Sequence, residues 1–195
     1  AIVLFLTTSA HAAEPKNQLP RQQHKISDAP FLSPSEAVAK MAIPDGFDVS
    51  VFASEPDIAE PIAFCFDYRG RMWVAENFNY QTRRQHTDEQ VSRIQILEDT
   101  NSDGVFDKKK TFTDKLTFTS GLACGFGGVF VGSPPNLTFI PDADGDDVPD
   151  GPPEVLLDGW GIRDRHETLN SFIWGPDGWL YGCHGVFTHS NVGKP

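Results

Sequence analysis

Features typical of several protein classes are missing from this sequence. No apolar run approaches the ~20 residues that a membrane-spanning helix requires, so the mature chain is predicted to be soluble. No cluster of Lys or Arg offsets the formal net charge of -11. Nucleic acids and anionic membranes both require a basic face, so we expect neither as a partner. Helical periodicity is almost absent beyond residue 45, which favours a chain built of strands.

Cysteine is scarce, with three residues in the chain, and no Cys-x-x-Cys-His haem attachment motif occurs. Cys65 and Cys124 fall on equivalent predicted strands, whereas Cys183 comes just after a strand of another kind. Two interpretations of the first pair stay open. They are ordinary core residues, or they form a disulfide in an exported protein and leave the third cysteine unpaired.

Glycine, proline and aromatic residues are plentiful, with 17 Gly, 15 Pro and 11% aromatics. This composition suits many short strands separated by tight turns. Three hairpins follow that plan, at 64–75, 122–132 and 172–182, each with an apolar strand, a glycine-containing turn and a second apolar strand. The third turns through Gly175-Pro-Asp-Gly178, where Pro fixes one dihedral and Gly accepts a positive φ.

The hairpins begin a repeat of about 50–60 residues. Two further apolar segments follow each of the first two hairpins, at 93–97 and 110–113, then at 137–140 and 154–157. Four short strands per unit predict an all-β fold, a partial β-propeller of about two and a half blades over residues 45–195. Asp45 to Phe52 alternates like a further strand of this region. Because a propeller closes with at least four blades, we expect the chain to be the N-terminal part of a longer protein.

The first 44 residues precede these blades. Ile2 to Leu6, followed by Ala10-His-Ala12, is typical of a secretory signal peptide and indicates a remnant of one over residues 1–13. The alternative is a disordered or buried N-terminal strand. Residues 14–44 read as a linker with a short helix, for which Ser33 is the N-cap, Pro34 the first helical residue and Glu36 the capping partner. The signal predicts a periplasmic or secreted protein.

Two acidic turns follow the third strand of their units and place oxygen side chains at loop positions 1, 3, 5 and 9. This is the spacing by which a short loop wraps Ca²⁺. The candidate ligands are Asp99, Asn101, Asp103 and Asp107 in the first turn, and Asp142, Asp144, Asp146 and Asp150 in the second. Neither turn has the Glu that an EF-hand carries at position 12, so a site would be weak or completed by another segment. The alternative is a turn capped by its own side chains, without metal.

His166 leads into the innermost strand of the third hairpin, so it should lie at the rim of a propeller's central channel, on the face opposite the acidic turns. A neutral imidazole there can take a hydroxyl proton. Asp164 or Glu167 would orient it. Arg163 or Arg165 would stabilise negative charge. Other polar residues expected on this face are Glu76, Asn77, Tyr80, Arg83, Arg84, His86, Asn136, His184 and His189. The alternative is a solvated or structural histidine.

Four segments carry a family resemblance: Pro44 to Pro56, Gly70 to Glu76, Leu97 to Gly104 and His166 to Cys183. From about Leu32 to Gly193 the chain resembles the N-terminal propeller of the membrane-bound dehydrogenases of planctomycetes and their relatives, which is similar to the propeller of soluble quinoprotein glucose and sorbosone dehydrogenases. The resemblance implies a six-bladed propeller that oxidises a sugar or other alcohol with pyrroloquinoline quinone (PQQ). It also implies that His166 is the base, and that a c-type haem domain farther along the complete chain accepts the electrons.

Two other functions fit the same fold. One is a calcium-dependent hydrolase or lactonase in which Glu76 and asparagines at the channel hold the metal. The other is a non-catalytic propeller that binds glycan or protein, or that anchors an electron-transfer domain. The sequence does not identify a substrate. The same fold is compatible with all three functions, because a fold alone does not determine function.

Overall fold

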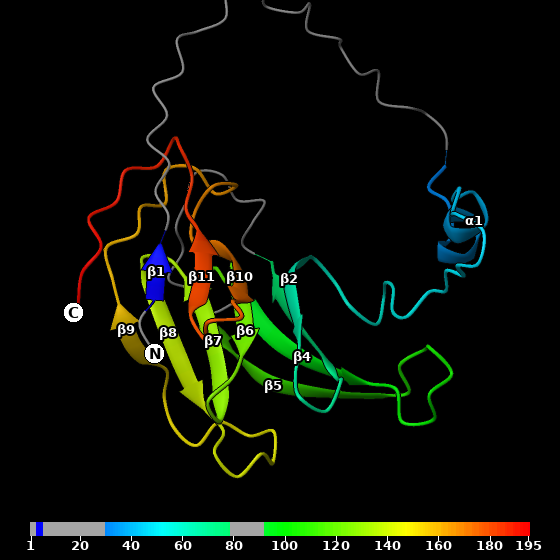
Figure 1. The fold of residues 1–195 in the computed structure, drawn as a ribbon, viewed down its shortest axis with the longest axis horizontal. Coiled ribbons are helices and arrows are strands. Elements are labelled where there is room, and N and C mark those ends of the chain that lie inside the picture. Colours follow the sequence, from blue (N-terminus) through cyan, green and yellow to red (C-terminus); the bar gives the residue numbers. More distant parts are fainter. Residues whose placement is uncertain (1–2, 6–29, 79–91) are drawn as a thin grey trace, which may run out of the picture. The chain divides into compact units, whose positions relative to one another are not determined.

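The computed structural model describes residues 3–5, 30–78 and 92–195, and these form a mostly β structure with antiparallel sheets (Figure 1). The all-β prediction is therefore confirmed. The chain divides into two compact units, one of residues 9–51 and one of residues 1–8 with 52–195. Within the described residues no helix is long and apolar enough to cross a membrane.

The helix predicted near residue 34 is confirmed as α1 (Pro34–Ala39). Its N-cap Ser33 accepts a hydrogen bond from the backbone N–H of Glu36, and the Glu36 carboxylate accepts one from the backbone N–H of Ser33 at 2.8 Å. This capping box satisfies two amide groups that a helix start would otherwise leave unpaired. None of the helix residues is buried, so the cap rather than packing defines this element.

The prediction of a strand over residues 45–52 is wrong. These residues have no regular secondary structure, and Phe47 is 68% exposed. Gly46, at φ +86°, turns the chain at the start of the segment. Alternating apolar residues form a strand only when a neighbouring strand pairs with their backbone, and no described strand pairs with this segment.

Ten strands make up the repeat that the sequence predicts, and each predicted strand of the three hairpins and their following segments is confirmed. The first sheet contains β2 (Pro61–Phe66), β3 (Met72–Asn77), β4 (Ser92–Glu98) and β5 (Lys108–Leu116) in chain order. The second contains β6 (Gly121–Cys124), β7 (Gly128–Ser133), β8 (Asn136–Pro141) and β9 (Glu154–Leu157), again in chain order. The third contains β10 (Asn170–Trp174) and β11 (Leu180–Cys183).

The third sheet has one more strand, β1 (Val3–Phe5), which pairs in parallel with Leu180–Gly182 of β11. It comes from the segment in which the sequence predicts a secretory signal. Residues 1–2 and 6–29 lie outside the described residues, as does most of the predicted linker. The signal peptide and the export that it implies therefore stay predictions.

Hydrophobic cores lie between successive sheets. Trp73 and Ile96 of the first sheet meet Val129 and Val131 of the second, and all four are almost fully buried. A second cluster joins Phe130 of β7 to Leu180 of β11. Each sheet thus buries one face against the next, because its inward-facing positions alternate with the outward-facing ones.

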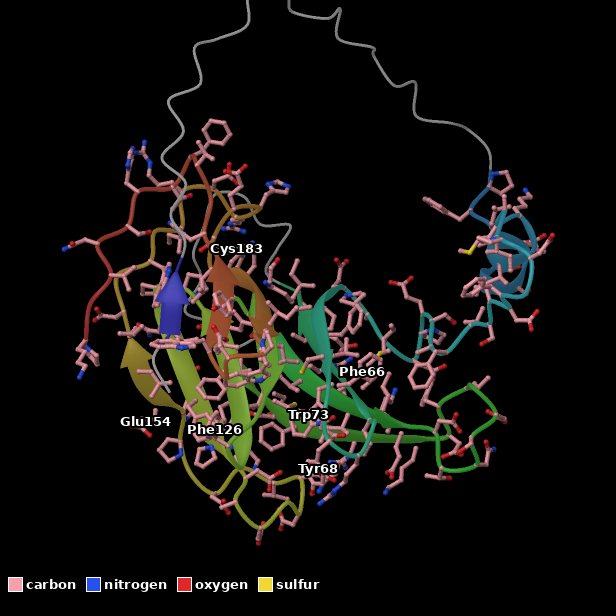
Figure 2. All side chains as sticks on the ribbon, in the orientation of Figure 1. Phe66, Tyr68, Trp73, Phe126, Glu154 and Cys183 are labelled. Carbon is pink, nitrogen blue, oxygen red and sulfur yellow. The ribbon has the colours of Figure 1, made fainter. Side chains whose placement is uncertain are left out.

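The loops gather at two ends of this stack of sheets. The hairpin turns and the second acidic turn lie at the lower end in Figure 1, where Arg69 Nη2 donates to Gly145 O at 3.1 Å. The connections between sheets lie at the upper end, where Ser120 Oγ donates to Leu169 O at 2.6 Å. Figure 2 shows Cys183 toward the upper end and Tyr68 toward the lower one. The connection that carries His166 is therefore at the opposite end from the second acidic turn.

Candidate functional site

His166 lies in the connection between β9 and β10, where a short side-chain turn holds it. The Asp164 carboxylate oxygen Oδ1 accepts the backbone N–H of His166 at 3.0 Å and lies 3.4 Å from the ring nitrogen Nδ1. Asp favours such turns because its oxygen reaches the amide two residues on. Asp164 is anchored in turn by Thr188, whose hydroxyl accepts the backbone N–H of Asp164 at 2.9 Å. The imidazole itself is 63% exposed and so accessible to a small molecule.

A pocket of about 500 Å³ opens beside His166, where the first strands of the three sheets come together. Its walls come from β2, β6 and β10 and from the connections that precede the latter two. They are Ile62, Ala63, Phe64, Ser120, Leu122, Arg165, His166, Asn170, Ser171 and Phe172. A second pocket of about 450 Å³ adjoins it, and His166 and Asn170 also line that one. Ligand sites are usually concave with a few convergent polar groups. The smaller pocket is mainly apolar, whereas the larger one exposes more polar than apolar surface.

Arg165 supplies a positive charge in the larger pocket. Its guanidinium carbon lies 5.4 Å from the centre of the Phe118 ring, and Phe118 is buried. A cation over a ring face is attracted by the ring quadrupole, so this contact orients the arginine. Arg163 is exposed and lines neither pocket. Of the two arginines that the sequence places beside the histidine, Arg165 is therefore the one in the pocket.

Glu167, one of the two residues expected to orient the imidazole, is engaged elsewhere. Its Oε2 accepts the backbone N–H groups of Val186 at 2.9 Å and Phe187 at 3.2 Å. Its backbone carbonyl accepts the N–H of Gly185 at 2.7 Å. Glu167 thus fixes the loop after β11, and Asp164 is the carboxylate beside the histidine ring.

His184 lines the smaller pocket, but its ring is held by its own loop. Nε2 lies 3.1 Å from Thr188 O and 2.7 Å from Ser190 Oγ. Nδ1 is buried without a hydrogen-bond partner among the described residues. His189 is exposed and lines neither pocket. His166 and His184 therefore both line the smaller pocket. The ring of His184 is the more constrained of the two, because its own loop holds it.

Glu76 and Asn77 do not line either pocket. Glu76 is fully buried, and its carboxylate accepts hydrogen bonds from Ala59 N at 2.6 Å, from Gln95 Nε2 at 3.4 Å and from Arg93. Asn77 is also buried and donates to Thr119 O at 2.8 Å. Both side chains link β3 to neighbouring segments by hydrogen bonds. Asn136 opens β8, whereas Tyr80, Arg83, Arg84 and His86 lie outside the described residues.

The two acidic turns share one hydrogen-bond scheme. In each turn the carboxylate at position 9 accepts the N–H of position 2, the side chain at position 3 accepts that of position 5, and the carboxylate at position 5 accepts that of position 7. Positions 4 and 6 have positive φ in both. These positions are Ser102 and Gly104 in the first turn, and Gly145 and Asp147 in the second. The glycine therefore stands at position 6 in the first turn and at position 4 in the second, while the backbone conformation at both positions is the same.

The turns differ in how their first carboxylate is surrounded. Asp99 is half-buried and accepts the N–H groups of Ser102, Asp103 and Gly104, and the bond from Gly104 is the main reason that its pKa lies below the ordinary value. Asp142, the first residue of the second turn, is only 8% exposed. Burial raises its pKa, and the neighbouring Asp147 carboxylate adds to that rise. The first turn thus resembles a self-capped loop more closely than the second does.

An ion-pair network that the sequence does not reveal fixes the second turn to the first sheet. Arg71 donates from both terminal nitrogens to the Asp147 carboxylate, each at 2.8 Å, and from Nε to Asp67 Oδ2 at 2.8 Å. Arg71 and Asp67 side chains are almost fully buried. Because 76 residues separate Arg71 from Asp147, no local motif could have signalled this contact.

Comparison with curated proteins and with solved structures gives no significant match. A family model matches residues 33–194, which is most of the chain and includes both acidic turns, the pockets and all three hairpins. The chain belongs to the family described as "Domain of unknown function (DUF7133)".

Proposed function

We propose that the chain forms the first blades of an exported, six-bladed β-propeller dehydrogenase, which oxidises a sugar or other alcohol with a quinone cofactor and uses His166 as its base. The single observation that carries the proposal is the pocket of about 500 Å³ that holds His166 and Arg165 at the meeting point of β2, β6 and β10. Propellers bind ligands where the innermost strands of their blades converge.

The topology supports the propeller. Two successive four-stranded sheets run in simple chain order, and a third begins in the same way with β10 and β11. Each sheet packs face to face on the next through a hydrophobic core. Radial repetition of such sheets is how a propeller is built. The resemblance to the membrane-bound dehydrogenases of planctomycetes agrees with this arrangement.

The pocket residues fit a planar, anionic quinone such as PQQ. Arg165 offers a guanidinium for carboxylate groups. Phe64 and Phe172 offer apolar surface for a flat ring system, and Asn170 and Ser171 offer polar atoms. The chemistry that a bound quinone supplies is acceptance of the hydride that leaves the alcohol carbon.

The chain's own residues remove the proton of the substrate hydroxyl. A hydrogen on Nδ1 of His166 that points to Asp164 leaves the lone pair on Nε2, and that nitrogen takes the proton of the substrate hydroxyl. Asp164 both orients the ring and stabilises the imidazolium that forms. The carbonyl product, the proton on His166 and the hydride on the acceptor together balance the oxidation.

The test is dye reduction by the complete protein, reconstituted with PQQ and Ca²⁺ and offered sugars and simple alcohols. His166→Ala should lower turnover by about 10²–10⁴-fold, which is the usual contribution of a general base. His189→Ala is the matched control, because that histidine is exposed and lines neither pocket. Turnover in His166→Ala equal to that of the control would overturn the proposal.

The two other functions have less support. A hydrolase with its metal on Glu76 conflicts with the three hydrogen bonds that the buried Glu76 carboxylate already accepts. Lactone hydrolysis without quinone would nevertheless revive it. An absence of activity in both assays would favour a propeller that binds glycan or protein.

A further inference from the structure

We propose that the second acidic turn binds a divalent cation, Ca²⁺ in preference to Mg²⁺, through the carboxylates of Asp142, Asp144 and Asp146. Each of these residues offers one oxygen, and the three oxygens lie within 4.8 Å of one another. Among the described residues this is the one group of three acidic, His or Cys side chains that meets so closely. The site is at the far end of the sheets from His166, so it does not depend on the proposed dehydrogenase.

A buried oxygen without a partner points to a ligand. Asp142 is more than nine-tenths buried, and its Oδ1 has no hydrogen-bond partner among the described residues. Buried polar atoms are nearly always paired, so an unpaired carboxylate oxygen in such a place calls for an ion or water. A cation shared with Asp144 and Asp146 would satisfy that oxygen.

The charge balance also calls for a cation. Of the nearby basic side chains, Arg71 is paired with the Asp147 carboxylate, whereas Arg69 and Lys110 donate to backbone carbonyls of the turn, Gly145 O and Asp146 O. Within the part of the chain that the structure describes, no basic group forms an ion pair with Asp142, Asp144 or Asp146. Three carboxylates held this close repel one another unless a positive charge lies between them.

The turn selects Ca²⁺ over Mg²⁺ by its ligands. Ca²⁺ accepts six to eight oxygens in an adaptable arrangement, whereas Mg²⁺ demands a near-ideal octahedron and releases its water reluctantly. The carbonyl of Val148 at position 7 and water would complete the shell. Because Pro153 stands at position 12 in place of a bidentate Glu, we expect a weak site, with a Kd of about 10⁻⁴–10⁻³ M.

The chain provides its own matched variants. The first turn carries Asn101 at the position of Asp144, so the shared backbone conformation accommodates an amide there. Asp144→Asn therefore removes a ligand charge without changing the turn. Asp103→Asn in the first turn is the control, since Asp103 holds the position that Asp146 holds in the second.

The experiment is thermal unfolding of the full chain after chelator treatment, with and without about 10 mM CaCl₂ or MgCl₂. Ca²⁺ should raise the unfolding midpoint of the wild type and of Asp103→Asn by about 3–10 °C, and Mg²⁺ should raise it less. Asp142→Asn and Asp144→Asn, which keep an amide oxygen but lose a ligand charge, should reduce the Ca²⁺ shift. Retention of the wild-type shift in Asp144→Asn, or no shift in the wild type, would overturn the proposal.

A spectroscopic readout locates the cation independently of stability. The Tyr68 hydroxyl lies 2.9 Å from Arg69 Nε, and the same arginine donates to Gly145 O in the second turn. Tb³⁺ replacing Ca²⁺ there should therefore emit when tyrosine is excited. Ca²⁺ should displace it, and Tyr68→Phe should weaken the emission while keeping the thermal shift. Equal emission from Asp144→Asn and the wild type would count against the site.

Discussion

Arg71 links the first sheet to the second acidic turn at the lower end of the sheets. It is buried between two carboxylates, and both owe part of their low pKa to it. Its hydrogen bond is the main cause of the lowered pKa of Asp147. For Asp67, burial alone would raise the pKa, but hydrogen bonds from Trp73 and Arg71 outweigh that effect and hold it below its ordinary value.

Arg71→Met should therefore lower the free energy of unfolding by about 3–5 kcal/mol at pH 7, because it leaves buried carboxylates without their partner. Groups with a depressed folded pKa stabilise above the ordinary Asp pKa of about 3.9 and lose that contribution as pH falls through the folded pKa. The difference between variant and wild type should accordingly shrink below about pH 4. Denaturant titrations at pH 7 and pH 3 measure both quantities.

The control is Lys108→Met, which breaks the exposed ion pair with Glu98. Exposed pairs contribute about 0–1 kcal/mol, so this variant should stay close to the wild type. A loss in Arg71→Met no larger than in the control would show that the network does not stabilise the fold.

At the level of single residues, the sequence predicted that Asp164 lies beside His166, and their catalytic roles stay predictions. A histidine two residues after an aspartate is a local signal, and the structure brings the pair together. The burial of Glu76 could not be predicted from a local signal of this kind. Its burial depends on Ala59, Arg93 and Gln95, and no local pattern reports those contacts.

At the level of elements, the sequence predicted nearly every strand because each apolar segment is bounded by Gly, Pro or Asp turns. It failed at residues 45–52, where alternation alone gave no information about a partner strand. The capping box of α1 succeeded for the opposite reason, since all of its hydrogen bonds are local. Interactions between sheets, such as the approach of Cys65 on β2 to Cys124 on β6, are seen only in the structure.

Those two cysteines are free thiols whose sulfur atoms lie 3.5 Å apart. The hydrogen bond from Cys124 lowers the pKa of Cys65, and the same pairing raises the pKa of Cys124. Oxidised glutathione should be attacked by one of these two thiols and release one glutathione; attack by the other thiol on the mixed disulfide should then release the second glutathione and form a Cys65–Cys124 disulfide.

That bond would link the first and second sheets across about 60 residues and raise the free energy of unfolding by about 4 kcal/mol in the chain-entropy model. Alkylation under denaturing conditions, followed by peptide mapping, should find Cys183 modified and the other two protected. Cys183→Ser should leave the pairing unchanged. Alkylation of both Cys65 and Cys124 after oxidation would contradict the prediction.

At the level of the whole molecule, the face of β2 that bears Phe64 and Phe66 has large exposed apolar side chains. Phe66 is 57% exposed and packs edge-on against Phe64, whereas Cys65 on the opposite face meets the second sheet. In the proposed propeller, the last blade of the complete protein covers Phe66. Phe66→Ala should then cost about 3–5 kcal/mol in the complete protein, as truncation of a buried Phe does.

Tyr68→Ala is the comparison, since Tyr68 is exposed at the hairpin turn. Surface changes usually stay within about 0.5 kcal/mol. Urea unfolding of the complete protein and the two variants decides the matter. Equal stability of Phe66→Ala and Tyr68→Ala would mean that no blade covers this face.

The two acidic turns bear on how relatives of this chain can be found. Both repeat a pair of left-handed backbone positions, yet glycine occupies the sixth position in one and the fourth in the other. A search pattern that demands glycine at a fixed place would detect only the first turn. It would overlook the second, which has the closer cluster of carboxylates. Across diverged copies of such a loop, the oxygen-bearing side chains at positions 1, 3, 5 and 9 are the more durable signature. Those at positions 3, 5 and 9 accept the backbone N–H hydrogen bonds that hold the loop's shape.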